Sequence, residues 1–112
     1  MTEVSGKLAT AIVKNYRDRF GRGPTTARAH VGRDYALIIL GQAQTEVEQS
    51  LVAEGEKDSV ELLRRRIRQL AANEFSETTE EIVGRKVLAM LGDHNADANV
   101  SVLVFLLEPD RG

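Results

Sequence analysis

Apolar residues recur every four positions near the start of the chain, at Leu8, Ile12, Tyr16 and Phe20. Charged residues fill the intervening face, so this spacing predicts an amphipathic helix over residues 3–20. The helix should end at the turn that contains Gly21, Gly23 and Pro24. Glycine permits positive φ angles, and proline cannot continue a helical hydrogen-bond ladder.

A strand-like pattern comes next. Alternation over residues 25–31 and a β-rich run over residues 35–40 predict a β-hairpin. Thr45 and Glu48 then have the Thr-x-x-Glu spacing of a capping box, which predicts a short helix over residues 45–53.

A second, longer apolar stripe has helical spacing and contains Val60, Leu63, Ile67, Leu70 and Ala71. It predicts one long helix over residues 58–83, with a break near Ser76 or Thr78 as the alternative. Gly84 should end this helix. The rest of the chain is predicted as a strand, a polar connection and a last strand, over residues 86–91, 92–99 and 100–107.

The elements follow the order α-β-β-α-α-β-β. This order predicts an α+β fold with a four-stranded, largely antiparallel sheet packed with helices. At 112 residues the chain fits a single domain, which we place at residues 1–108. The tail, residues 109–112, is expected to fray because nothing apolar holds it.

Two of the predicted strands, residues 35–40 and 100–107, carry apolar side chains on both faces. A sheet with one solvated face would show polar residues at every second position. We therefore expect a homodimer or larger oligomer that covers the surplus apolar face. The alternative is a monomer whose helices divide between the two faces.

Composition narrows the classes of function. Fifteen Lys and Arg against 17 Asp and Glu give a net charge of −2, which disfavours nucleic acid as a partner. The absence of Cys fits a cytoplasmic location, and with two His it leaves no expected metal site or cofactor. The longest apolar run, residues 102–107, is too short for membrane insertion.

Arginines supply the main candidate chemistry. Arg22 lies in a Gly-Arg-Gly-Pro turn that could surround an anion. Its place after a helix C-terminus favours the alternative, in which Arg22 compensates the last carbonyls of the helix. Arg64, Arg65 and Arg68 belong to the only basic run, together with Arg66. That run predicts either a solvated helix face or a surface for an acidic partner or nucleic acid.

Acidic and amide residues alternate from Asp93 to Asn99, as in the first half of a calcium loop. The loop lacks Gly at its sixth position and Glu at its twelfth, so we expect a solvated hairpin connection without calcium. His30 and His94 have no acid or nucleophile beside them in the sequence, and we expect both on the surface.

Several of these segments together resemble the MpsC-like family over nearly the whole chain: Phe20-Gly21-Arg22-Gly23-Pro24, Thr45-Glu46-Val47-Glu48, the Arg-rich helix, and Ile82-Val83-Gly84-Arg85-Lys86-Val87. The family takes its name from a component of a bacterial sodium-translocating, membrane-potential-generating system. The resemblance implies a small bacterial cytoplasmic protein with no established catalytic residues.

We therefore expect a non-enzymatic cytoplasmic accessory or regulatory protein, associated with an ion or bicarbonate-transport or membrane-potential-generating system. A protein of such a transport system is its expected partner, beside a second copy of the chain. The alternative is a module that binds nucleic acid or small anions through the Arg-rich helix. The candidate anion- or partner-binding residues are Arg22, Arg64, Arg65, Arg68 and Arg85, and the structural motif residues are Gly21, Gly23, Pro24 and Gly84.

Overall fold

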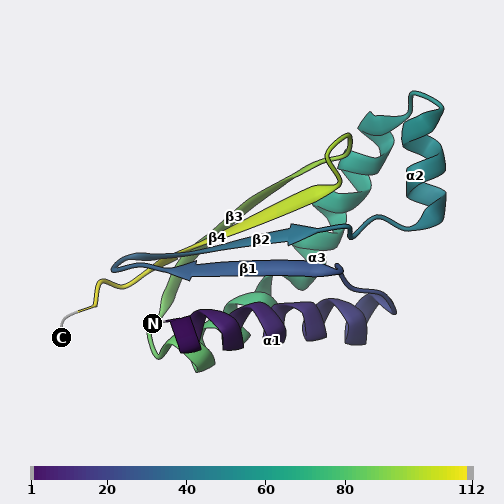
Figure 1. The fold of residues 1–112 in the computed structure, drawn as a ribbon. Coiled ribbons are helices and arrows are strands. Elements are labelled where there is room, and N and C mark those ends of the chain that lie inside the picture. The colour runs from purple at the N-terminus through teal and green to yellow at the C-terminus, as the bar shows by residue number, and fades with distance from the viewer. Residues whose placement is uncertain (1, 111–112) are drawn as a thin grey trace.

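The computed structural model describes residues 2–110 (Figure 1). Its elements follow the predicted order α-β-β-α-α-β-β, and the predicted α+β class is confirmed. Their bounds are α1 Thr2–Phe20, β1 Thr26–Val31, β2 Tyr35–Gly41, α2 Glu46–Ala53, α3 Lys57–Val83, β3 Val87–Asn95 and β4 Val100–Leu107.

The four strands form one antiparallel sheet in the order β1-β2-β4-β3. Strand β4 is therefore central, although it is last in the chain, and β1 and β3 are the two edges. The register aligns side chains in rows that cross all four strands. One such row is Arg28, Ile39, Val102 and Asp93.

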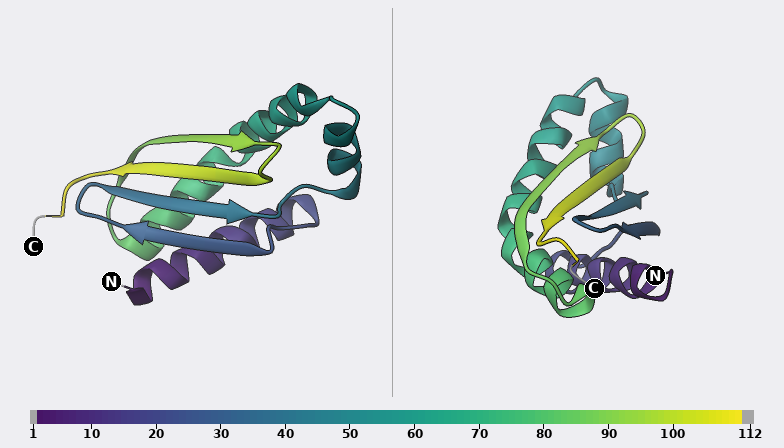
Figure 2. Two further views of the ribbon diagram at one scale, coloured as in Figure 1. Left: turned by 45° about the horizontal axis from the view of Figure 1, so that its top comes forward. Right: turned by 90° about the vertical axis from the view of Figure 1, so that its left-hand side faces the viewer.

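Helices α1 and α3 pack against the same face of the sheet (Figure 2). Their buried side chains meet alternate residues of the two central strands in one core, which includes Leu8, Ile12, Tyr16, Phe75, Ile38, Leu40, Leu103 and Phe105. Figure 2 shows strands on one side and these two helices on the other. The monomer with helices on both faces is therefore not the structure found.

Helix α3 runs unbroken through Ser76 and Thr78, as one of the two sequence alternatives expected. Helix α2 packs against α3, and both extend beyond the end of the sheet (Figure 1), which gives the molecule extents of 51 × 21 × 21 Å. Gly21 and Gly84 adopt φ angles of 81° and 77° where α1 and α3 end, so both glycines have the predicted stop conformation.

Strand β3 is longer than the sequence pattern predicted. Residues 92–95 were expected in a polar connection, but they pair with residues 100–103 of β4. The pairing overrides the turn-like composition of this segment, because each strand residue satisfies its backbone groups against its neighbour. The connection shrinks to residues 96–99, and Asn99 has a φ angle of 54° there.

The inward stripe of α3 also differs from the prediction. Leu63 and Leu70 are 45% and 64% exposed, whereas Val60, Ala71 and Phe75 are fully buried. Arg64 lies on the buried side because its charge is neutralised inside the protein, as described below. A charged residue therefore replaces the expected leucine on the core-facing side of the helix.

At the end of the chain, the backbone N–H of Asp110 donates to the carbonyl oxygen of Arg33 at 3.0 Å. Residues 111 and 112 of the predicted frayed tail lie outside the described residues.

Candidate functional site

The Gly-Arg-Gly-Pro turn follows α1 and leads into β1. Gly23 lies close to α1, since a Cβ there would be 3.1 Å from the backbone oxygen of Val13. Pro24 is buried, whereas Arg22 is exposed to solvent. The turn therefore fixes how the chain leaves the helix, and it leaves the Arg22 side chain exposed to solvent.

Arg64 makes a buried ion pair with Glu48 across the α2–α3 contact. Its Nε lies 2.7 Å from Glu48 Oε2, and its terminal nitrogen lies 2.6 Å from Glu48 Oε1 and 2.6 Å from the carbonyl oxygen of Ala43. The two side chains are 6% and 5% exposed. An external anion would have to displace Glu48 to reach this guanidinium.

Glu48 has a second role as part of the predicted capping box, which the structure contains. The Thr45 N–H donates to Glu48 Oε1 at 2.9 Å, and the Glu48 N–H donates to Thr45 Oγ1 at 3.2 Å. Burial raises the pKa of Glu48, but the hydrogen bonds and charge of Arg64, with the Thr45 bonds, outweigh burial and hold it below 4.5. The carboxylate therefore stays charged and joins α2 to α3.

The other candidate arginines have separate positions. Arg65 is exposed on α3. Arg68 is half-buried and lies over Gly92 of β3, where an added Cβ would come within 2.6 Å of Arg68 Cδ. Arg85 donates to the carbonyl oxygens of Gly32, Arg33 and Glu108, which holds the β1–β2 turn beside the end of β4.

His94 is not on the surface, so that prediction is wrong. It lies on the helix-facing side of β3, is 4% exposed, and its Nδ1 lies 2.5 Å from the hydroxyl oxygen of Ser101 on β4. Burial, followed by the charge of Arg64, lowers the pKa of His94 below 6.5. The cause of the error is the unexpected length of β3, which turns this position toward the core.

This pair does not form an accessible catalytic site. Ser101 is also only 4% exposed, so a substrate could reach its hydroxyl only by displacing core side chains. Gln44, in the segment before α2, is 1% exposed and donates through Nε2 to the carbonyl oxygen of Ala96. We call Gln44, Glu48, Arg64, His94 and Ser101 the buried polar cluster, because the charges of Arg64 and Glu48 both act on His94. Its hydrogen bonds join α2 to α3 and the segment before α2 to the β3–β4 turn.

The side chains of the calcium-like segment make separate contacts with the protein and do not converge on one point. Asp97 pairs with Lys57 at 3.3 Å, Asn95 Oδ1 accepts from the Ala98 N–H, and Asn99 Oδ1 accepts from the Gln44 N–H. Over residues 2–110 no group of three or more His, Asp or Glu side chains is placed to hold a metal ion.

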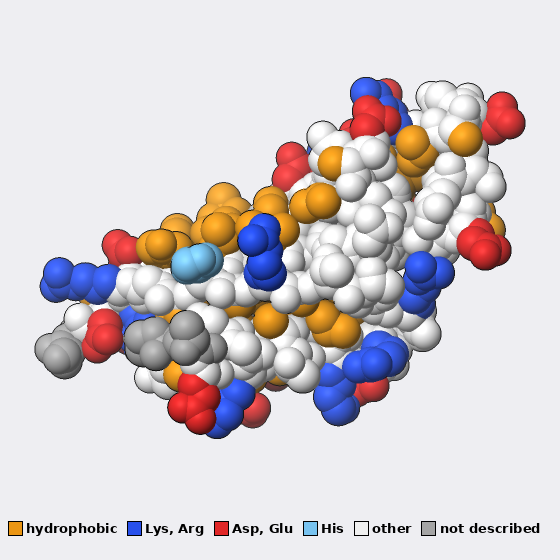
Figure 3. Space-filling model, in the orientation of Figure 1, with side chains coloured by type: hydrophobic (Ala, Val, Ile, Leu, Met, Phe, Trp, Pro, Cys, Tyr) orange, Lys and Arg blue, Asp and Glu red, His pale blue; other side chains and the backbone are white. Residues whose placement is uncertain are grey.

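The face of the sheet turned away from the helices is apolar at its centre. We call it the open face, and its central residues are Leu37, Ile39, Val102 and Val104. These four are half-buried, while Leu91, Tyr35 and Leu106 beside them are 54%, 42% and 41% exposed. Figure 3 shows hydrophobic side chains gathered over the strands, with a histidine and a basic side chain next to them.

Among the strand residues 26–107, charged side chains on the open face lie at its two edges. Arg28 is on β1 and Asp93 is on β3, at opposite ends of one row of the sheet. Both are exposed, and neither makes an ion pair within residues 2–110. The Asp93 carboxylate does accept a hydrogen bond from the N–H of His94 at 2.9 Å.

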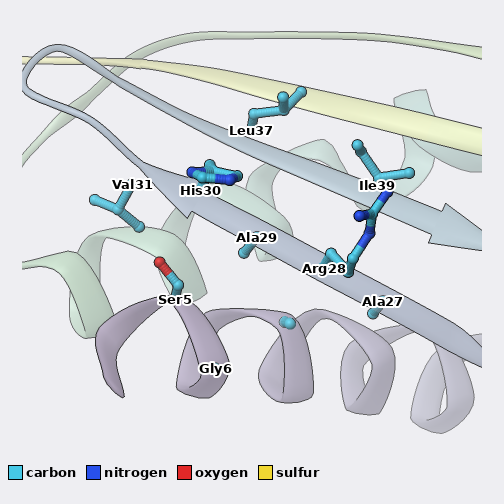
Figure 4. Close-up of a pocket in the computed structure, with 10 residues that line it drawn as sticks. Ser5, Gly6, Ala27, Arg28, Ala29, His30, Val31, Leu37 and Ile39 are labelled. Carbon is cyan, nitrogen blue, oxygen red and sulfur yellow. The ribbon is translucent and has the colours of Figure 1, made fainter. Parts of the chain in front are cut away.

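A hollow of about 650 Å³ runs along edge strand β1 (Figure 4). Ala27, Ala29 and Val31 point toward α1, whereas Arg28 and His30 rise on the side of Leu37 and Ile39. The hollow thus adjoins the open face and contains few titratable groups. Its lining suits contact with apolar surface better than acid–base chemistry.

Fold and surface together define a small α+β protein whose helices cover one sheet face and whose other face is apolar and accessible. The family model described as Na+-translocating membrane potential-generating system (MpsC) matches residues 2–109. The chain therefore belongs to the MpsC family. Neither the curated proteins nor the solved structures gave a match to it. Across residues 2–110, none of the helices has the length and hydropathy that crossing a bilayer requires.

Proposed function

We propose that this protein is a non-enzymatic, cytoplasmic accessory or regulatory component of a bacterial Na+-translocating, membrane-potential-generating system, and that it acts as a homodimer. The family match links the chain to such a system. The open face supports the proposal that the protein acts by contact with another chain. Exposed apolar surface of this extent is typical of protein–protein contact.

The buried polar cluster supports a structural role over a catalytic one. Arg64 and Glu48 neutralise each other, and the Ser101 and His94 side chains contact each other inside the core. General acid–base catalysis needs a group within hydrogen-bond reach of a bound substrate. The surface that remains accessible is suited to binding another chain.

The alternative, an anion or nucleic-acid module on the Arg-rich helix, has less accessible charge than the sequence suggested. Arg64 is buried, Arg68 is half-buried against β3, and Arg85 is engaged with backbone carbonyls. Filter binding to single- and double-stranded DNA and RNA at low salt tests this alternative. We expect no steep salt dependence attributable to Arg65 or Arg22.

Deletion of the gene in its own host tests the proposed function. We expect a smaller Na+-dependent membrane potential in the deletion strain, restored by the wild-type chain, and co-purification of the tagged chain with the membrane subunits of the transporter. An unchanged potential together with absence of those subunits would refute the proposal.

A further inference from the structure

The open face has an arrangement of charge that is complementary to itself. Its middle rows run from a basic or neutral residue on β1 to an acidic or apolar one on β3: Arg28, Ile39, Val102, Asp93, and then His30, Leu37, Val104, Leu91. Positive charge is thus confined to one edge and negative charge to the other, with four aliphatic side chains between them.

Two sheets that pack face to face keep their strands roughly aligned and lie about 10 Å apart. In a two-fold dimer the symmetry axis can run along the strands or across them. An axis along the strands, between β2 and β4, places β1 of one copy over β3 of the other. Arg28 of each copy then faces the partner's Asp93, and Leu37 faces the partner's Val104.

An axis across the strands, midway between these two rows, gives a different match. It would place β1 over β1 and β3 over β3, so that Arg28 would face the partner's His30. Asp93 would face the partner's Leu91, and its charge would be buried against an aliphatic side chain without a partner. Electrostatic complementarity therefore selects the axis along the strands.

We propose that the open face binds the open face of a second copy about a two-fold axis parallel to the strands, with two symmetric Arg28–Asp93 ion pairs at its edges. This inference gives the geometry of the homodimer within the proposed function. Its test measures mass and affinity of the isolated chain, so its result is independent of any transport partner.

The size of the face sets the expected affinity. Four strands about 4.8 Å apart, counted over about seven residues each at about 3.4 Å per residue, span about 450 Å². Two copies would cover about 900 Å² in projection, close to the roughly 1,000 Å² at which specific interfaces begin. We therefore expect a dimer that dissociates on dilution.

Sedimentation equilibrium over a wide concentration range, with charge-reversed variants, tests the proposal. Arg28→Asp and Asp93→Arg should each weaken dimerisation on the order of tenfold, because each creates two like-charge contacts per dimer. The double variant should recover most of the affinity. Arg22→Asp is the matched control, since it makes the same charge change away from the open face.

A second variant examines the apolar centre. Leu37→Asp should give a monomer at every concentration, while Leu70→Asp, on the exposed side of α3, should dimerise like the wild type. Circular dichroism melts establish that each variant is folded. The proposal would be overturned if the wild type is a monomer at all concentrations, or if the double variant dimerises no more tightly than the single variants. A monomeric wild type would indicate that the open face binds a different protein.

Discussion

The two faces of the sheet are made by alternate residues of the same strands, yet they differ in what covers them. On β2, Ala36, Ile38 and Leu40 are fully buried beneath α1 and α3, whereas Leu37 and Ile39 on the open face are half-buried. The covered face also tolerates polar residues, because Ser101 and His94 contact each other there. The open face keeps its charges at the edges.

If the proposed dimer forms, this difference separates side chains that stabilise the fold of one chain from side chains that contact a second chain. Substitutions beneath the helices should change the free energy of unfolding. Substitutions on the open face should change association and leave the folded monomer nearly as stable as before.

The largest expected effect concerns the buried ion pair. Arg64→Ala should lower the free energy of unfolding by about 3–5 kcal/mol, because Glu48 is left buried without its countercharge. Urea denaturation measures the loss. Arg65→Ala is the control, and its exposed position predicts a change within about 0.5 kcal/mol. Equal effects of the two variants would contradict the role assigned to the pair.

The next effect concerns the contact between α3 and β3. A Cβ at Gly92 would lie 2.6 Å from Arg68 Cδ and 2.6 Å from the backbone oxygen of Val102. Gly92→Ala should therefore cost about 1–3 kcal/mol of stability. Gly6→Ala has open space around it and should instead stabilise α1 by up to about 1 kcal/mol. Thermal melts of both variants test these expectations. If Gly92→Ala leaves the stability unchanged, the contact of Gly92 with Arg68 and Val102 is not tight.

A smaller effect is the pH dependence caused by His94. Its pKa is lowered in the folded chain, so the unfolded chain takes up a proton at higher pH. The free energy of unfolding should thus fall as pH drops below 6.5, with a slope of at most about 1.4 kcal/mol per pH unit. His94→Gln should remove this slope, and His30→Gln should retain it. A wild-type slope unaffected by His94→Gln would assign the titration elsewhere.

The smallest effect on stability is expected on the open face. Leu91 is 54% exposed, so Leu91→Ser should change the free energy of unfolding of the monomer by no more than about 0.5 kcal/mol. Denaturation at concentrations below the dimer dissociation constant measures it. A loss as large as that of Arg64→Ala would show that this face already belongs to the core of one chain.

Element order, strand pairing class and helix ends could be predicted from the sequence, because they depend on local signals. Such signals are the period-four apolar stripe of residues 8–20 and the capping box of Thr45 and Glu48. The glycines Gly21 and Gly84 are signals too, and in the structure both have the positive φ angles expected at a helix end. The length of β3 could not be predicted, since it depends on pairing with β4.

The candidate site could be predicted less well from the sequence. Arg64 and Glu48 are sixteen residues apart, and nothing local marks them as a pair. The burial of His94 depends on which way β3 turns its side chains. The sequence did predict apolar residues on both sides of two strands, which is the basis of the open face. The alignment of Arg28 and Asp93 in one row could not be predicted, because it depends on the strand order.

In the proposed dimer, two open faces meet about an axis along the strands. Within one chain, His30 and Leu91 lie in the same row but on opposite edges, three strand spacings or about 14 Å apart. In the proposed dimer the His30 ring lies over the partner's Leu91. An isotope-filtered nuclear Overhauser experiment on mixed labelled and unlabelled chains should show contacts between His30 ring protons and Leu91 methyl groups. Intermolecular contacts from Leu62, Leu63 or Leu70 of α3 in their place would contradict this arrangement of the dimer.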